Sequence, residues 1–197
     1  MKISQTKSYS GASDKLCRLG LAETFVHLQE AIFDTKVYLS SKRKPSKGVL
    51  VSRQFAKALI GGPSWRRDAS GKWIGQFRYE DQFLSRLGLE IQISSRSDLL
   101  IRDIVHLRNS LQEGVIDIGV IVVPDDEMQV FLTDRTPSYR DAVRYIEKEF
   151  KEATTFPIII IAIEHDGISD TALPKKKTNL SATVSEIKPI RRTRRRT

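Results

Sequence analysis

The spacing of apolar residues changes period along the first half of the chain, and each period predicts a different kind of element. Residues 14–39 carry apolar side chains at three- and four-residue steps, which predicts a helix with Asp14 as its N-cap. Residues 73–79 and 88–94 instead alternate apolar and polar positions, as half-buried strands do. We expect these two strands to pair as a hairpin.

The second half of the chain repeats a helix-then-strand order. Residues 97–113 show helical periodicity between a capping Ser97 and Gly114, and 116–124 is a nearly continuous apolar strand of the kind that is covered on both faces. A polar loop is predicted for 125–137. Ser138 is then placed to cap a helix over 139–153, and a buried strand follows over 158–163.

This order of elements predicts one α/β domain over residues 1–169, with a central mixed β-sheet flanked by helices. Residues 170–197 lack core-forming side chains and are expected to form a flexible basic tail. The apolar runs are too short to cross a membrane, and the first residues lack the apolar stretch of a signal peptide, so a cytoplasmic location is expected. The single cysteine, Cys17, lies on an apolar helical stripe and is predicted to be buried.

Charge is distributed very unevenly along the chain. The net charge is +9, but residues 40–78 alone carry ten basic and one acidic side chain, and 174–197 carry nine basic and one acidic. Residues 79–173 carry nine basic and 18 acidic side chains. Two basic blocks around an acidic middle favour a polyanionic partner such as nucleic acid, because Lys and Arg at this density attract phosphates.

The acidic middle contains the stretch DQFLSRLGLEIQ at 81–92, whose polar residues are candidates for metal chemistry. On a strand, Glu90 and Gln92 share one face, while Leu89 and Ile91 point to the other. Asp81 is expected at the end of the preceding strand, from where the hairpin would bring its carboxylate beside Glu90. Two converging carboxylates and the Ile91 carbonyl would hold Mg²⁺, and Gln92 would orient a water. An ordinary polar strand face has the same spacing.

These residues also resemble the active-site segment of type II restriction endonucleases of the BglII and BstYI branch of the PD-(D/E)xK nuclease superfamily. In that branch an Asp is followed nine residues later by Glu-x-Gln, as in Asp81, Glu90 and Gln92 here. The stretches VIDIGVIVVP (115–124), TPSYRDAVRYI (136–146) and FPIIIIAIEHDG (156–167) are similar to later segments of these enzymes, in the same order. The resemblance implies a restriction-endonuclease-like fold and Mg²⁺-dependent cleavage of double-stranded DNA. It also implies a homodimer and a partner DNA methyltransferase.

The resemblance also indicates where the chain would contact DNA. The segment before the Ser-Tyr helix contributes to base recognition in these enzymes, which suggests DNA-binding roles for Asp134, Arg135, Thr136 and Ser138. A salt pair between Asp134 and Arg135 at the surface is the plainer alternative. Backbone phosphates would be contacted by basic side chains at Lys42, Arg43, Lys44, Lys47, Arg191, Arg192, Arg194, Arg195 and Arg196.

Two alternatives stay open at this point. The first is a PD-(D/E)xK nuclease with another role, in repair or in cleavage of modified DNA. The second is a non-catalytic nucleic-acid-binding protein whose carboxylates are ordinary strand polars. The three histidines are too scattered along the sequence to suggest a metal cluster, and His106 is expected to be a surface residue or a satisfied helix residue. Trp73 is expected in the core.

Overall fold

A six-stranded mixed β-sheet organises the computed structural model, which describes residues 1–39, 65–67, 73–79, 83–93, 97–132 and 135–168. The strand order is β1-β7-β6-β5-β4-β3. The three central strands β5, β6 and β7 are parallel, whereas β1, β4 and β3 pair antiparallel to their neighbours. The predicted mixed sheet of one α/β domain is therefore confirmed.

The chain forms the six strands of this sheet, the helices that connect them, and a separate two-stranded parallel sheet made of β2 and β8. The strands are β1 (Lys2–Ser8), β2 (Tyr38–Leu39), β3 (Trp65–Arg67), β4 (Trp73–Tyr79), β5 (Phe83–Ile91), β6 (Ile118–Pro124), β7 (Ile158–Glu164) and β8 (Gly167–Ile168). The α-helices are α1 (Ala12–Arg18), α2 (Ala22–Asp34), α4 (Ser97–Gln112), α5 (Asp126–Gln129) and α6 (Tyr139–Arg144). A π-helical turn, Tyr145–Glu149, and a 3-10 turn, Lys151–Thr155, extend α6.

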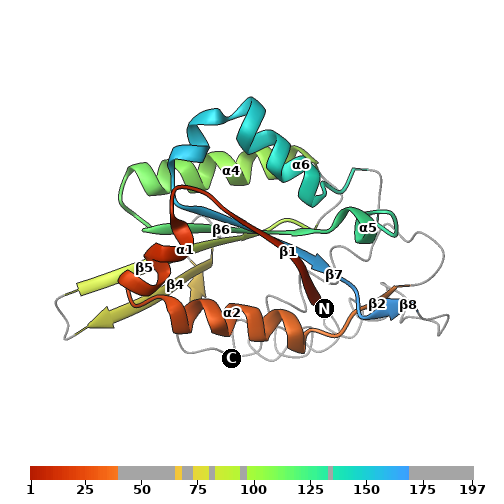
Figure 1. The fold of residues 1–197 in the computed structure, drawn as a ribbon, viewed down its shortest axis with the longest axis horizontal. Helices are drawn as coiled ribbons and strands as arrows, with labels where there is room; N and C mark the ends of the chain where they lie inside the picture. The colour runs from red at the N-terminus through yellow and green to blue at the C-terminus, as the bar shows by residue number, and fades with distance from the viewer. Residues whose placement is uncertain (40–64, 68–72, 80–82, 94–96, 133–134, 169–197) are drawn as a thin grey trace, which may run out of the picture.

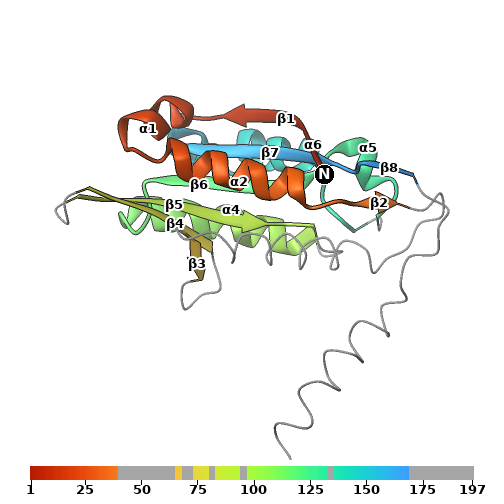
Figure 2. The same cartoon turned by 90° about the horizontal axis from the view of Figure 1, so that it is seen from below.

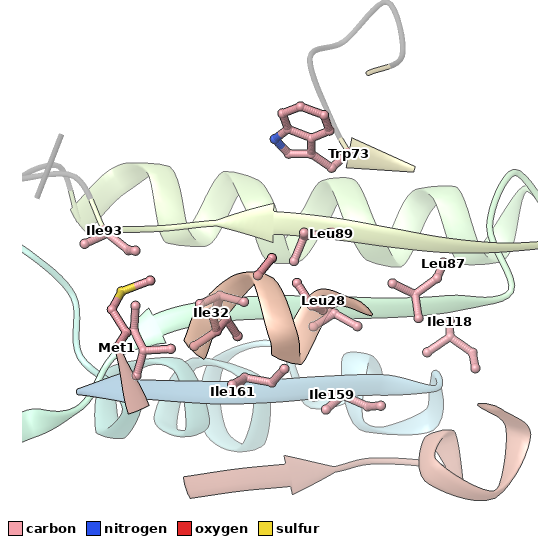
Figure 3. Close-up of a cluster of buried hydrophobic side chains, with 14 of the residues drawn as sticks. Met1, Leu28, Ile32, Trp73, Leu87, Leu89, Ile93, Ile118, Ile159 and Ile161 are labelled. Carbon is pink, nitrogen blue, oxygen red and sulfur yellow. The ribbon is translucent and has the colours of Figure 1, made fainter. Parts of the chain in front are cut away.

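Helices cover both faces of the sheet (Figure 1). Helices α4 and α6 lie on one face and α2 lies on the other, as the view turned by 90° also shows (Figure 2). Each face has its own apolar cluster. On the α2 side Leu28 and Ile32 pack with Leu87 and Leu89 of β5 (Figure 3). On the other side Leu107 of α4 belongs to a second cluster, with Ile121 of β6 among its members.

Strands β6 and β7 confirm the expectation drawn from their continuous apolar sequences. All seven residues of β6 are buried, and β7 is buried except for its last residue. Sheet strands with helices above and below have no polar face, because neither side reaches water. Trp73, expected in the core, is 5% exposed and belongs to the cluster on the α2 side.

The first 39 residues differ from the single helix that was predicted. The helical pattern is split into α1 and α2 by a turn at Gly20, whose φ of 67° suits a residue without a side chain. The N-cap of α1 is Gly11, and Asp14 lies in the first turn instead. Strand β1 was missed, because most of its side chains are exposed and its sequence is largely polar. Its partner β7 lies far away in sequence.

The hairpin of β4 and β5 is confirmed, with corrections to its boundaries. Strand β4 matches the prediction, but β5 begins at Phe83 and ends at Ile91 rather than spanning 88–94. Before β4, the short strand β3 forms within the basic stretch 40–78, where no strand was predicted ahead of residue 73. Cross-strand pairing with β4 explains both differences, since it supplies the backbone hydrogen bonds that sequence alternation alone does not reveal.

Three further differences lie outside the sheet. The loop predicted over 125–137 contains the single-turn helix α5, capped by the side chain of Asp125. Helix α6 is confirmed with its Ser138 cap, but it passes into a π-helical and a 3-10 turn instead of staying α-helical to residue 153. Cys17 is exposed, because the short helix α1 buries Leu16 and turns its next residue to solvent.

The predicted tail, residues 170–197, lies outside the described residues, so its flexibility stays a prediction. Within the described residues, none of the helices combines the length and the apolar character that a membrane span requires.

Candidate active site

The face of β5 that carries Glu90 and Gln92 is turned toward α4. Gly88 lies on the same face, and a side chain placed there would meet Ile116 Cδ1 at 2.6 Å and Leu107 Cδ2 at 3.3 Å. Its cross-strand partner Gly119 also faces Leu107. Paired glycines on neighbouring strands thus let Leu107 approach the sheet closely, and this contact sets the distance between α4 and β5.

This close approach brings the next residues of both elements together. Glu90 lies two positions beyond Gly88 on the strand, roughly 7 Å along it. Asp103 lies four positions before Leu107 on the helix, roughly 6 Å along its axis. In a strand–helix–strand crossover the helix runs back along the sheet, so the two displacements point the same way. Glu90 is therefore placed against the first half of α4.

Glu90, Asp103 and His106 form a compact cluster at this point. Each offers one ligand atom, and these atoms all lie within 4.8 Å of one another. Two ligands on opposite sides of one metal ion are separated by roughly 4 to 4.6 Å, so a small side-chain adjustment would let all three reach one ion. Asp103 is 2% exposed, whereas Glu90 and His106 are partly exposed. The cluster therefore has a buried side and a side open to solvent.

The buried side of this cluster is electrostatically costly. Burial raises the pKa of the Asp103 carboxyl above its ordinary value, against the opposing hydrogen bond and charge of Arg102. Arg102 Nη2 lies 3.2 Å from Oδ1 of Asp103, and the Arg102 side chain is 56% exposed. One half-exposed guanidinium compensates a buried carboxylate incompletely, so the site favours a further positive charge.

Gln92 follows on the same side of the sheet, just beyond the end of β5. The residue is 3% exposed, and its backbone N–H donates to the carbonyl of Val122 at 2.8 Å. Glu90 thus lies near the end of β5, and Gln92 follows it two residues later, just beyond the strand. Ile91, proposed to offer its carbonyl to a metal, lies between them and pairs with Val122 of β6.

Asp81 lies outside the described residues, so its role as the second carboxylate stays a prediction. The hairpin register constrains that role. Tyr79 and Phe83 are cross-strand partners, and the ladder runs from them to Trp73 and Leu89. Phe83, which follows Asp81 closely in the sequence, is at one end of this ladder, and Glu90 lies just past the other end. The two are seven residues apart, which is roughly 23 Å along the strand.

The predicted DNA-contacting residues are described only in part. Lys42, Arg43, Lys44, Lys47 and Asp134 lie outside the described residues, and so do Arg191, Arg192, Arg194, Arg195 and Arg196. Among the remaining three, Arg135 is exposed, whereas Thr136 and Ser138 are buried. Ser138 and Asp141 form a capping box, in which the Asp141 N–H donates to Ser138 Oγ and the Ser138 N–H donates to Asp141 Oδ2. Only Arg135 of these three thus presents an exposed side chain.

Sequence reasoning missed Asp103 and His106. His106 was expected to be a surface residue or a satisfied helix residue, and it lies beside two carboxylates. The available signal was the three-residue spacing from Asp103 to His106, which places both on one side of a helix, together with a charged residue on the buried face of that helix. Their partner Glu90 lies on another element, and only the fold brings it near.

The helix-flanked mixed sheet and the carboxylate–histidine cluster at the end of β5 together define an α/β protein with a candidate metal-binding site. Comparison with known families then identifies the chain more closely. The family model described as restriction endonuclease BglII/BglIII matches residues 7–163. The chain belongs to this family of restriction endonucleases and is thus a DNA-binding hydrolase, a DNA endonuclease. No curated protein matches the chain significantly.

Proposed function

We propose that the protein is a type II restriction endonuclease that hydrolyses phosphodiester bonds of double-stranded DNA at a short specific site, with Mg²⁺ as its cofactor. The observation that carries this proposal is the match of the chain to the BglII/BglIII family over residues 7–163, combined with Glu90 on the α4-facing side of β5 and Gln92 just beyond that strand. A bound divalent metal polarises a phosphate and lowers the pKa of a coordinated water.

Each residue of the strand has a distinct task in this proposal. Glu90 supplies the carboxylate that anchors the metal, and the neighbouring Ile91 offers a carbonyl oxygen. Gln92 is neutral, so it orients the attacking water without adding charge beside the phosphate. The fit of a divalent cation is supported by the closeness of the Glu90 and Asp103 carboxylate oxygens, which lie within 4.8 Å of each other.

The central experiment is digestion of phage DNA by the purified full chain, with and without Mg²⁺, followed by sequencing of the ends. Discrete fragments with one common end sequence support site-specific cleavage. Mg²⁺-dependent smearing would indicate a nuclease of another specificity, and intact DNA would contradict the proposal. A parallel digest of methylated and unmethylated plasmid tests for a modification-dependent enzyme, which would cut the unmethylated DNA poorly.

Glu90→Gln tests the strand residue directly. We expect at least a roughly hundredfold loss of cleavage, with DNA binding retained or tightened because a negative charge near the phosphates is removed. Glu113→Gln is the matched control, since it makes the same charge change at an exposed position just beyond the end of α4. Equal activity of both variants would remove Glu90 from the mechanism.

Asp81→Ala tests the spacing on which the resemblance rests. A role for Asp81 at the same ion as Glu90 requires a β4–β5 register different from the one described, because Phe83 lies roughly 23 Å along β5 from Glu90. Loss of cleavage equal to that of the Glu90 variant, with the melting temperature unchanged, would support the role of Asp81. Wild-type cleavage would exclude it from catalysis.

The proposal extends to partners. Palindromic sites are bound by twofold-symmetric proteins, so we propose a homodimer, with α4 as one candidate element of its interface. A DNA methyltransferase that protects the host site would complete the restriction system. Sedimentation equilibrium of the full chain measures the association, and a monomer on cognate DNA would contradict the dimer.

A further inference from the structure

Asp103 and His106 are not part of the proposed strand mechanism, yet both reach the Glu90 carboxylate. They lie three residues apart on α4, and with Glu90 they place two carboxylate oxygens and one imidazole nitrogen within 4.8 Å. The three residues come from two elements whose spacing is fixed by Leu107 against Gly88 and Gly119. The cluster is therefore a consequence of core packing, and its geometry does not depend on a surface loop.

The burial of Asp103 is the second observation. A carboxylate that is 2% exposed needs a cation or several hydrogen bonds to remain charged. Both hydrogen bonds that Arg102 donates go to Oδ1, so Oδ2 accepts no bond from this guanidinium. Replacing this buried acid with an apolar residue would have removed the cost, so its presence beside Glu90 and His106 indicates a ligand at this position.

The imidazole nitrogen determines which cation suits the cluster. Mg²⁺ prefers oxygen ligands and retains its waters, whereas divalent first-row transition ions also accept imidazole, Mn²⁺ less strongly than the later ions of the series. We propose that Asp103 and His106 join Glu90 in one metal site that binds a divalent transition ion such as Mn²⁺ more tightly than Mg²⁺. The inference rests on the proposed function for its use of Glu90 as a metal ligand. Both ions would bind to the carboxylates of Glu90 and Asp103. The imidazole nitrogen of His106 would add a ligand that strengthens the binding of the transition ion more than the binding of Mg²⁺.

Pulsed electron paramagnetic resonance of Mn²⁺ bound to the full chain, without DNA, tests this site. A directly bound imidazole nitrogen gives a strong coupling to the manganese electron spin. We expect this coupling in the wild-type protein and its loss in His106→Gln. His27→Gln, on α2 at the other face of the sheet, is the matched control and should retain it. Absence of the coupling in the wild type, or its survival in His106→Gln, would overturn the proposal.

Titration calorimetry adds an independent measurement. His106→Gln is expected to weaken Mn²⁺ binding at least about tenfold and Mg²⁺ binding much less, which lowers the preference for Mn²⁺. Asp103→Asn keeps the size of the side chain but loses the charge, so it should weaken both ions. Circular dichroism of each variant establishes that the fold is intact. Equal weakening of both ions by His106→Gln would contradict the role of the nitrogen.

The experiments distinguish failure of this metal site from failure of the proposed nuclease function. DNA cleavage that depends on Glu90, without the nitrogen coupling, would leave the nuclease in place and remove His106 from the metal site. Nitrogen-coupled Mn²⁺ binding in a protein that leaves DNA intact with either ion would support the metal site and contradict the nuclease.

Discussion

At the scale of single residues, Asp103 is a candidate metal ligand whose buried charge lowers the stability of the metal-free fold. The α4 face toward the sheet is otherwise formed mainly by Leu100, Ile104 and Leu107, all fully buried, and Asp103 interrupts it with a charge. Sites that bind cations commonly carry such a cost, because the same charge that binds the ligand destabilises the ligand-free fold.

Asp103→Asn is therefore expected to stabilise the metal-free protein. The substitution removes a buried charge and its repulsion with Glu90, and we expect an increase in unfolding free energy on the order of 1 kcal/mol. Urea denaturation in the presence of a chelator measures this change. Asp98→Asn, an exposed position near the start of the same helix, controls for a general change in helix charge. A destabilised Asp103→Asn would show that the carboxylate has a structural role through Arg102.

Asp125 is the opposite case, a carboxylate that supports the fold. Burial alone would raise its pKa, but hydrogen bonds from Ser4 Oγ, Gln5 Nε2 and two backbone N–H groups outweigh this effect and hold the pKa below 3.8. A pKa lower in the folded than in the unfolded state stabilises the fold above the unfolded value, and this contribution is lost as the pH falls through the folded pKa.

Asp125→Ala is expected to reduce the unfolding free energy by about 1–3 kcal/mol at pH 7, since it removes the α5 cap and two side-chain hydrogen bonds. The deficit should shrink as the pH falls below about 3.8, where Asp125 of the unfolded wild-type chain takes up a proton, and should go on shrinking until the pH has passed the lower pKa of the folded state. Denaturation at a series of pH values measures it, with Asp126→Ala as the neighbouring control. A deficit that is constant between pH 2 and 7 would contradict the charge argument.

At the scale of elements, the contact of α4 with the sheet determines the geometry of the site. Leu107→Ala opens a cavity between two glycines that have no side chains to fill it, so we expect a loss of about 2–5 kcal/mol of unfolding free energy. Leu99→Ala, on the same helix but only partly buried, should cost less. Chemical denaturation of both variants compares them. Equal losses would show that the glycine pair is not the main anchor of α4.

The elements also show what the sequence can and cannot reveal. Strand β6 and helix α4 were predicted because each has a local sequence pattern that indicates burial. In β6 this is a continuous apolar run, and in α4 it is an apolar residue every three or four positions. Strand β1 has an exposed, polar sequence and exists through its pairing with β7, more than 150 residues away. The Glu90–Asp103–His106 cluster depends in the same way on the packing of β5 against α4, and no local pattern records that packing.

At the scale of the whole molecule, the uneven charge along the sequence is what we expect if one part of the chain binds the metal and other parts bind the DNA backbone. The acidic stretch 79–173 contains the candidate metal ligands, whereas the excess of positive charge lies in 40–78 and 174–197. A nuclease needs both, since carboxylates that hold a cation also repel the DNA backbone and this repulsion must be offset elsewhere. The basic blocks are therefore expected to supply affinity without sequence preference.

Deletion of residues 174–197 tests this division. The segment carries nine basic side chains, and we expect the deletion to weaken binding to all duplexes alike. For each phosphate that the shortened chain no longer neutralises, the slope of log affinity against log salt should become shallower by about 0.9. Fluorescence anisotropy across salt concentrations measures this slope, and sequencing of cleaved ends records the site. A chain that keeps the full tail length but has Gln at the five arginines between 191 and 196 should lose part of the same affinity, because charge and not length is the cause. If either variant cut at a different sequence, the tail would take part in site recognition.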